Sequence, residues 1–301
     1  MLNSLSNRLR SIVSCKLTSV RRILECLTNA HWHNWPFGHE PSASKEEYLR
    51  LAKEVRKLIF PEIDEYEQKT GFAICAEWLH ELALHTQVVI KESPLCYAHG
   101  RVLYTALSQY LSERQATSSS ERLTIWETGT SRGFSALCMA KALNDLQHPG
   151  TILTFDLLPH NTTMYWNCID DLEEPKTRAE LLRPWQTLVR DFILFHQGDT
   201  RLELPKVHAE RIHFAFLDGA HTYQDVMFEF DQIRERQLPG DMIVYDDYTP
   251  KQFPGIVRVV DEICRNHHYR RTDLQANTRR GYVVPSKRNV CNATTICIMS
   301  V

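Results

Sequence analysis

The spacing of hydrophobic positions changes near residue 121. Before that point, apolar residues recur every three or four positions, as in residues 45–59 and 100–111, and this spacing predicts amphipathic helices. After it, short apolar runs alternate with amphipathic stretches, which is typical of strands joined by helices in a mainly parallel sheet. The sequence therefore predicts a helical first part followed by an α/β domain.

Seven short apolar runs after residue 121 are the predicted strands. They are residues 123–127, 151–155, 192–196, 212–217, 242–245, 268–272 and 282–284. Seven strands within about 165 residues fit one doubly wound, Rossmann-like sheet with helices on both faces. The polar and aromatic stretch at residues 157–191 is too long for a plain crossover, and we expect it to help shape a substrate pocket.

The first 43 residues follow a pattern of their own. An apolar stripe from Leu2 to Leu27 predicts an amphipathic helix with an arginine-rich polar face, and a proline-containing linker follows. Such a helix suits docking on the protein's own body or on a partner subunit, as in a homodimer, and an organellar presequence is the alternative. The predicted organisation is helix and linker at 1–43, a helical cap at 44–120 and the α/β domain at 121–301.

Composition and charge argue against several classes of protein. The 35 lysines and arginines nearly balance the 37 aspartates and glutamates, so no basic field exists to attract nucleic acid. No run approaches the roughly 20 apolar residues of a membrane-spanning helix. The nine cysteines include no Cys-x-x-Cys pair, and we expect reduced thiols in a cytoplasmic protein.

A glycine-containing loop, residues 126–135, joins the first predicted strand to a helix. Thr130 and Ser131 stand where a dinucleotide fingerprint would have its middle glycine, which argues against a nicotinamide-dependent oxidoreductase. Gly129 suits a tight turn, and Gly133 lets the helix begin close to the strand. The free amides at the start of that helix can hold a carboxylate.

Acidic residues end the first two predicted strands. Glu127 ends the first strand, and Asp156 ends the second, 29 residues later. Neighbouring parallel strands end at the same edge of a sheet, and an acid after the second strand suits a bidentate contact with ribose hydroxyls. An acid at that position can instead cap the following helix.

Three more carboxylates end two later strands. Asp218 follows one strand, and Asp246 and Asp247 follow the next. Such acids repel one another unless a cation neutralises them, and oxygen ligands suit Mg²⁺ better than zinc. His221, three residues after Asp218, could accept a proton near neutral pH, or it could cap the helix or hydrogen-bond a metal ligand.

Four segments of the chain resemble the motifs of class I S-adenosylmethionine-dependent methyltransferases. The segments are residues 127–135, Asp156, residues 198–199 and residues 216–223. The chain is most similar to metal-dependent small-molecule O-methyltransferases of the macrolide sugar and catechol types. The resemblance covers about residues 121–285 and implies that residues 121–301 form the methyltransferase domain.

The resemblance also implies roles for individual residues. The amino-acid part of the cofactor would be held by Glu127, Gly129, Thr130, Ser131, Gly133 and Ser135. Asp156 would bind the ribose, and Asp199 would lie beside the adenine. Asp218 would contribute to cofactor binding and catalysis, and it would bind the metal together with Asp246 and Asp247.

The predicted reaction is methyl transfer to a hydroxyl oxygen of a sugar, a phenol or another natural product. The oxygen would attack the sulfonium methyl in line, and a divalent cation would lower its pKa. His221 is the candidate base, although catechol-type relatives have a lysine there. The alternatives are a nucleotide-dependent oxidoreductase and a scaffold that keeps a cofactor loop without catalysis.

Overall fold

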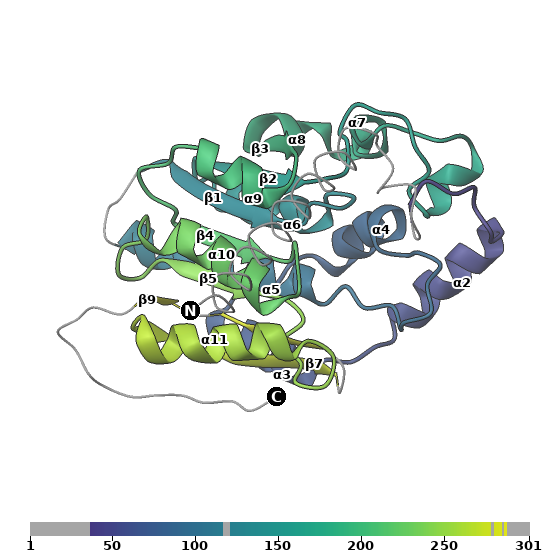
Figure 1. The fold of residues 1–301 in the computed structure, drawn as a ribbon. Helices are drawn as coiled ribbons and strands as arrows, with labels where there is room; N and C mark the ends of the chain where they lie inside the picture. Colours follow the sequence, from purple (N-terminus) through teal and green to yellow (C-terminus); the bar gives the residue numbers. More distant parts are fainter. Residues whose placement is uncertain (1–36, 117–120, 278–279, 285, 288–301) are drawn as a thin grey trace, which may run out of the picture.

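The computed structural model describes residues 37–116, 121–277, 280–284 and 286–287 (Figure 1). The predicted N-terminal amphipathic helix lies outside the described residues. The helical region that precedes the sheet consists of α2 (Lys45–Val55), α3 (Pro61–Thr70), α4 (Ala76–Thr86) and α5 (His99–Ala116). Both helices that the spacing predicts within this region are present as α2 and α5, with shifted ends.

The sheet contains a central path of seven strands in the order β3-β2-β1-β4-β5-β8-β7. Its strands are β1 (Leu123–Thr128), β2 (Gly150–Asp156), β3 (Ile193–Gln197), β4 (Phe214–Leu217), β5 (Met242–Tyr245), β7 (Asp273–Asn277) and β8 (Arg280–Val283). β1 to β5 pair in parallel, whereas β8 pairs antiparallel with both β5 and β7. The predicted Rossmann-like fold class is confirmed.

The last part of the sheet differs from the prediction. Residues 268–272 were expected to form one strand, but only β6 (Tyr269–Arg270) is extended there, and it pairs with β9 (Ser286–Lys287). The stretch Asp273–Asn277, which contains few strand-favouring residues, forms β7 because it pairs with β8 in a hairpin. Pairing with a neighbour outweighs the weak local preference.

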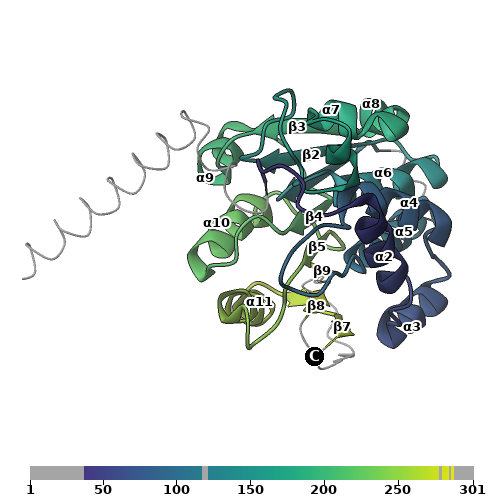
Figure 2. The same ribbon diagram turned by 90° about the vertical axis from the view of Figure 1, so that its right-hand side faces the viewer.

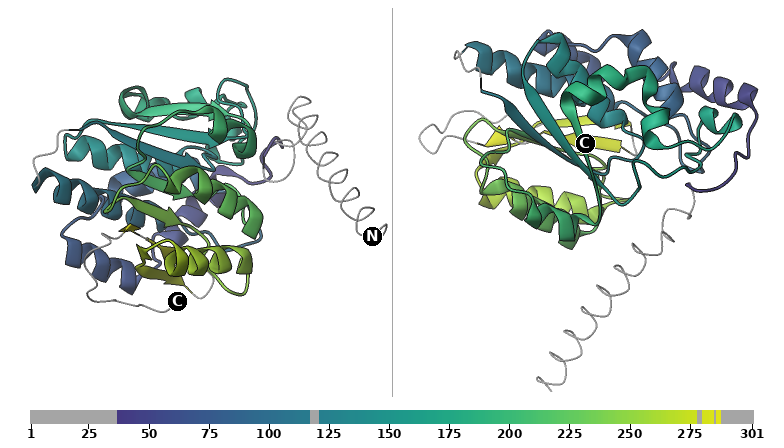
Figure 3. Two further views of the ribbon diagram at one scale, coloured as in Figure 1. Left: turned by 60° about the vertical axis from the view of Figure 1, so that its left-hand side comes forward. Right: turned by 90° about the horizontal axis from the view of Figure 1, so that it is seen from above.

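Helices cover both faces of the sheet (Figures 2 and 3). One core cluster joins α3, α4, α5 and α6 (Phe134–Asp145) to strand residues such as Ile125 and Phe216. The other joins α10 (Tyr223–Arg234) and α11 (Pro254–Asn266) to Trp126 and Ala215. Because side chains alternate across a strand, residues at the carboxyl end of β1 also divide between the two faces.

The predicted helical cap shares its core with the sheet. Residues of α5 and α6 belong to one buried cluster, and the Tyr110 hydroxyl on α5 donates a 2.8 Å hydrogen bond to Asp241, just before β5. Arg211 also donates to the fully buried Asp241 carboxylate. These contacts join the helical region to the sheet within one packed body.

The stretch at residues 157–191 forms a small folded unit over the edge of the sheet. It contains η1 (Ile169–Leu172), α7 (Arg178–Leu181), η2 (Arg183–Trp185) and most of α8 (Gln186–Phe192). Its own apolar cluster is built from Leu158, Met164, Trp166, Cys168 and Leu181, and Phe37 packs against it. Its expected part in a substrate pocket stays a prediction.

Two further expectations concern thiols and membrane spans. The five cysteines within the described residues are free thiols, and three of them are buried. In that part of the chain, no helix combines the length and the hydropathy needed to cross a membrane. The other four cysteines lie outside the described residues, so the expectation of reduced cysteines stays a prediction for them.

Candidate active site

The cofactor loop and the acidic loop meet where the strand order reverses. β1 lies between β2 and β4, so the loops after β1 and β4 leave the sheet side by side. Gly129 has φ +87°, and a Cβ atom placed on it would lie 2.3 Å from the Asp218 carbonyl oxygen. Doubly wound sheets bind ligands at such a reversal. Only glycine lets the two backbones approach this closely.

The turn from β1 into α6 uses backbone conformations that few residues adopt. Ser131 has φ +49°, and Gly133, the residue before α6, has φ +91°. The Gly133 amide donates to the Thr130 carbonyl at 2.7 Å, and the Ser131 amide donates to Asp156 Oδ2 at 2.5 Å. The loop is therefore anchored to the end of β2, and the first amides of α6 are left available to a ligand.

Glu127 is fully buried on the face of the sheet that α6 covers. The Thr154 hydroxyl donates to Glu127 Oε2, and the Ser135 hydroxyl also hydrogen-bonds the carboxyl group. Glu127 Oε1 has no hydrogen-bond partner. Burial raises the pKa of Glu127 to about 7, against the opposing effect of these hydroxyls. A buried acceptor without a partner fits a site for a ligand's ammonium group.

The other predicted cofactor residues also lie at this edge of the sheet. Asp156 ends β2, and its Oδ1 accepts a 2.8 Å hydrogen bond from the Leu158 amide. Asp199 follows β3 and caps the short helix α9 (Thr200–Glu203) by accepting from the Arg201 amide at 2.9 Å. A carboxylate has about four acceptor sites, which suits the hydroxyl and amine donors of a nucleoside.

The acidic loops bring together Asp218, His221 and Asp247. His221 Nε2 lies 3.2 Å from Asp247 Oδ2 and 3.8 Å from Asp218 Oδ1. One ligand atom from each of the three residues lies within 4.8 Å of the others, which is close enough to share a metal ion. The Phe253 ring stacks on His221 with 4.6 Å between centroids, which fixes the plane of the imidazole.

Asp246 and Asp247 occupy different environments. Asp247 has φ +55°, a conformation that aspartate tolerates better than most residues, and its side chain joins the group with Asp218 and His221. Asp246 is buried, and its Oδ1 accepts a 2.6 Å hydrogen bond from the Asp247 amide. Within the described residues, the candidate metal-binding group contains Asp218, His221 and Asp247 but not Asp246. Its role as a metal ligand stays a prediction.

Two buried residues near these loops were not predicted from the sequence. Glu229, on α10, accepts a 2.9 Å hydrogen bond from the Thr128 hydroxyl, and burial raises the pKa of Glu229 to about 7. Arg178, on α7, donates to the Ser131 carbonyl at 2.8 Å. Both lie in stretches whose local pattern resembles a solvated helix face, so only the tertiary structure shows that their charges are enclosed.

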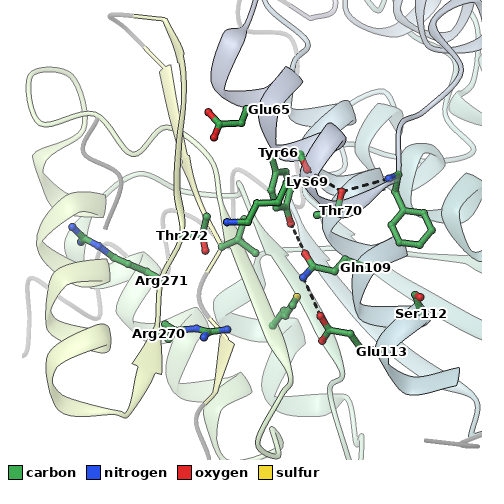
Figure 4. Close-up of a pocket in the computed structure, with 13 residues that line it drawn as sticks. Glu65, Tyr66, Lys69, Thr70, Gln109, Ser112, Glu113, Arg270, Arg271 and Thr272 are labelled. Atoms are coloured by element: carbon green, nitrogen blue, oxygen red, sulfur yellow. Dashed lines mark hydrogen bonds between the residues drawn. The ribbon is translucent and has the colours of Figure 1, made fainter. Parts of the chain in front are cut away.

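A separate cavity of about 480 Å³ lies between α3, α5 and the segment around Arg270 (Figure 4). Lys69 and Arg270 line it together with Glu65 and Glu113. None of the predicted site residues lines it. The cofactor loop and the acidic group therefore form a site distinct from this cavity.

The central part of the chain matches a known family. Residues 126–248 match the family model described as "Methyltransferase domain". This segment contains the glycine loop, Asp156 and all three strand-end acids of the acidic loops. Residues 126–248 therefore match a methyltransferase domain, as the resemblance in the sequence predicts.

Solved structures with similar folds include several methyltransferases. The O-methyltransferase TomG from Streptomyces achromogenes, in complex with S-adenosylmethionine, is 16% identical, with 72% of this chain and 92% of TomG covered at a TM-score of 0.49. An O-methyltransferase from Bacillus cereus, in complex with S-adenosylhomocysteine, is 16% identical, with 79% and 96% covered at a TM-score of 0.45. An rRNA methylase from Streptococcus thermophilus is 11% identical, with 63% and 96% covered at a TM-score of 0.42. No curated protein matches the chain.

Replacing Gly129 by alanine tests the close approach of the two loops. Gly240 has a similar φ of +96° but no atom within 4 Å of an added Cβ, so Gly240→Ala measures the conformational cost alone. We expect Gly240→Ala to lower the free energy of unfolding by about 1–2 kcal/mol. Gly129→Ala adds the clash with Asp218 and should cost about 3 kcal/mol or more. If urea unfolding shows that both variants lose the same free energy of unfolding, the close approach of Gly129 to the Asp218 carbonyl is contradicted.

The buried Glu127 carboxyl predicts a pH dependence of stability. Its pKa rises from 4.5 in the unfolded chain to about 7 in the folded protein, so the folded state binds more protons between these values. The free energy of unfolding should therefore fall as the pH rises from 4.5 to 7. Since one pKa unit corresponds to about 1.4 kcal/mol, a pKa change from 4.5 to about 7 makes the contribution of Glu127 at most about 3.5 kcal/mol.

Urea unfolding without cofactor between pH 4.5 and 8 measures this effect. Glu127→Gln should flatten the decrease, whereas the exposed Glu235→Gln should leave it unchanged. Glu229 has a similar pKa and should contribute the remaining part of the slope. The same slope in wild type and Glu127→Gln would show that Glu127 is ionised in the folded protein throughout this range.

Proposed function

We propose that this protein transfers the methyl group of S-adenosylmethionine to a hydroxyl oxygen of a small molecule, with the assistance of a divalent cation. The observation that carries this proposal is the group of Asp218, His221 and Asp247 directly beside the cofactor loop. A methyltransferase domain supplies the donor site, and the adjacent carboxylates supply oxygen ligands that suit a hard cation.

The cofactor site uses residues on both sides of the β1 edge. Glu127 Oε1, buried and without a partner, accepts from the cofactor ammonium group. The first amides of α6, together with Ser135, bind its carboxylate. Asp156 binds the ribose hydroxyls, and Asp199 lies beside the adenine. The buried acceptor at Glu127 and the available amides of α6 support this assignment.

The cation site is built from carboxylates on two neighbouring loops. Asp218 and Asp247 would hold the ion, and Asp246 is the third ligand expected from the sequence. A bound divalent cation such as Mg²⁺ lowers the pKa of a hydroxyl group that it coordinates. With an ion bound, Asp218 and Asp247 would hold the acceptor oxygen beside the cofactor loop, and methyl transfer needs that oxygen in line with the methyl group.

His221 accepts the proton that the acceptor hydroxyl loses. Its Nε2 faces both Asp218 and Asp247, and the Phe253 ring fixes the plane of the imidazole. An imidazole nitrogen has one lone pair, so Nε2 either takes the proton or coordinates the ion. As the base, His221 controls the rate of methyl transfer and leaves the affinity for the cation largely unchanged.

Metal dependence of turnover tests this proposal. The purified protein is incubated with S-adenosylmethionine and a panel of phenols, catechols and sugars, and the release of S-adenosylhomocysteine is measured. Exhaustive chelation should abolish turnover, and added Mg²⁺ or Mn²⁺ should restore it. Asp218→Asn and Asp247→Asn should each raise the half-saturating metal concentration about 10- to 100-fold.

Two further variants separate the roles of the neighbouring residues. His221→Gln should lower kcat about 100-fold or more, with an unchanged metal requirement. The exposed Asp231→Asn serves as the matched control and should change neither quantity. Full turnover after chelation would contradict the claim that the reaction requires a divalent cation. A raised metal requirement in His221→Gln would identify His221 as a metal ligand. Methylated nitrogen in the products, found by mass spectrometry, would exclude a hydroxyl acceptor.

A further inference from the structure

Arg178 enters the cofactor site from the stretch at residues 157–191. It is the first residue of α7, a short helix that begins with reciprocal hydrogen bonds between Thr177 and Glu180. The Arg178 side chain is only 2% exposed. A guanidinium group is almost never enclosed to this extent unless its donors and its charge are matched by neighbours.

Aromatic rings hold the Arg178 guanidinium in place. Its central carbon lies 5.4 Å from the centre of the Trp166 ring and 5.5 Å from the centre of the Phe195 ring. Trp166 belongs to the same stretch as Arg178, whereas Phe195 lies on β3. These contacts fix the direction in which the planar group donates its hydrogen bonds.

The donors of Arg178 point at the cofactor loop and at the end of β2. Nε donates to the Ser131 carbonyl at 2.8 Å, and a terminal nitrogen donates to the Leu158 carbonyl at 3.3 Å. A terminal nitrogen also lies 3.8 Å from Asp156 Oδ2. Asp156 in turn accepts from the Ser131 amide. Ser131, in its left-handed conformation, is thus held by its amide on one side and its carbonyl on the other.

Arg178 is also the positive charge that acts on Glu127. The other groups facing that carboxyl are Asp156, which opposes its ionisation, and the hydroxyls of Ser135 and Thr154, which favour it. The buried thiol of Cys138 lies near enough for its own pKa to be raised further by Glu127. Within the part of the chain that the structure describes, Arg178 is the positive charge that lowers the pKa of Glu127.

We propose that Arg178 is a positioning residue for S-adenosylmethionine, which couples the stretch at residues 157–191 to the cofactor site. It holds Ser131 in the conformation that the loop requires, it lies beside the Asp156 carboxylate, and its positive charge favours the ionised form of Glu127. The inference rests on the proposed roles of Glu127 and Asp156 in cofactor binding.

Binding of S-adenosylhomocysteine, followed by calorimetry between pH 6 and 8, tests this inference. Arg178→Met keeps much of the packing but removes the donors and the charge. Loss of a charge-assisted hydrogen bond should weaken binding roughly 10- to 100-fold. Without the positive charge, Glu127 should ionise at higher pH, so the pH at which affinity rises should also move upward. Arg178→Lys should weaken binding while leaving that pH close to the wild-type value.

Arg211→Met is the matched control. Arg211 is also largely buried and donates to the Asp241 carboxylate, but it lies outside the cofactor loop and is not among the charges that act on Glu127. Its replacement should leave the pH dependence of binding unchanged. A change of the same size in Arg211→Met would mean that loss of any enclosed guanidinium, rather than the position of Arg178, causes the change.

The possible outcomes separate this inference from the proposed function. If wild type binds and folded Arg178→Met has the same Kd and pH dependence, the inference is wrong while the cofactor site stands. If Arg178→Met does not fold, Arg178→Lys decides, and wild-type affinity in that variant would overturn the inference. If folded wild type binds no S-adenosylhomocysteine, the cofactor site fails, and the inference fails with it.

Discussion

The close approach of two backbones at Gly129 is the constraint on which the site depends. The loop after β1 carries most of the residues predicted to bind the cofactor, and the loop after β4 carries Asp218. Because an added Cβ on Gly129 would lie 2.3 Å from the Asp218 carbonyl oxygen, no other residue allows these loops to touch. Parallel pairing of β1 with β4 brings the loops to the same edge, and the glycine removes the remaining separation.

Buried acids on both faces of β1 surround this contact. Glu127 points toward α6, and Thr128 points toward α10, where its hydroxyl donates to Glu229. Both glutamates are enclosed, and burial raises the pKa of each to about 7. Together with Asp218 and Asp247, these two glutamates place four acidic groups near one edge of the sheet. A cationic cofactor and a divalent ion would neutralise the negative charge of this edge.

Much of the fold and of the site could be predicted from sequence, because local rules dominate there. Alternating apolar runs identified the five parallel strands, and residues at strand ends share one edge, which is why Glu127, Asp156 and Asp218 could be expected close together. The hairpin formed by β7 was missed because Asp273–Asn277 is extended only through its pairing with β8.

Residues that act across long sequence separations could not be predicted. Arg178 reaches Ser131 from 47 residues away, and Glu229 reaches Thr128 from 101 residues away. The sequence also did not distinguish Asp246 from Asp247. Only the left-handed backbone at Asp247 turns one carboxylate toward His221, while Asp246 stays buried.

The nearness of the donor methyl group to the cation is the central claim, and Mn²⁺ can test it directly. S-adenosylmethionine carrying a ¹³C-labelled methyl group is bound to the protein, and the relaxation of that methyl signal is followed as Mn²⁺ is added. We expect strong relaxation enhancement in wild type and its loss in Asp247→Asn at the same Mn²⁺ concentration. Separate binding of cofactor and Mn²⁺ with no enhancement would show that the two sites are not neighbours and would contradict the proposed mechanism.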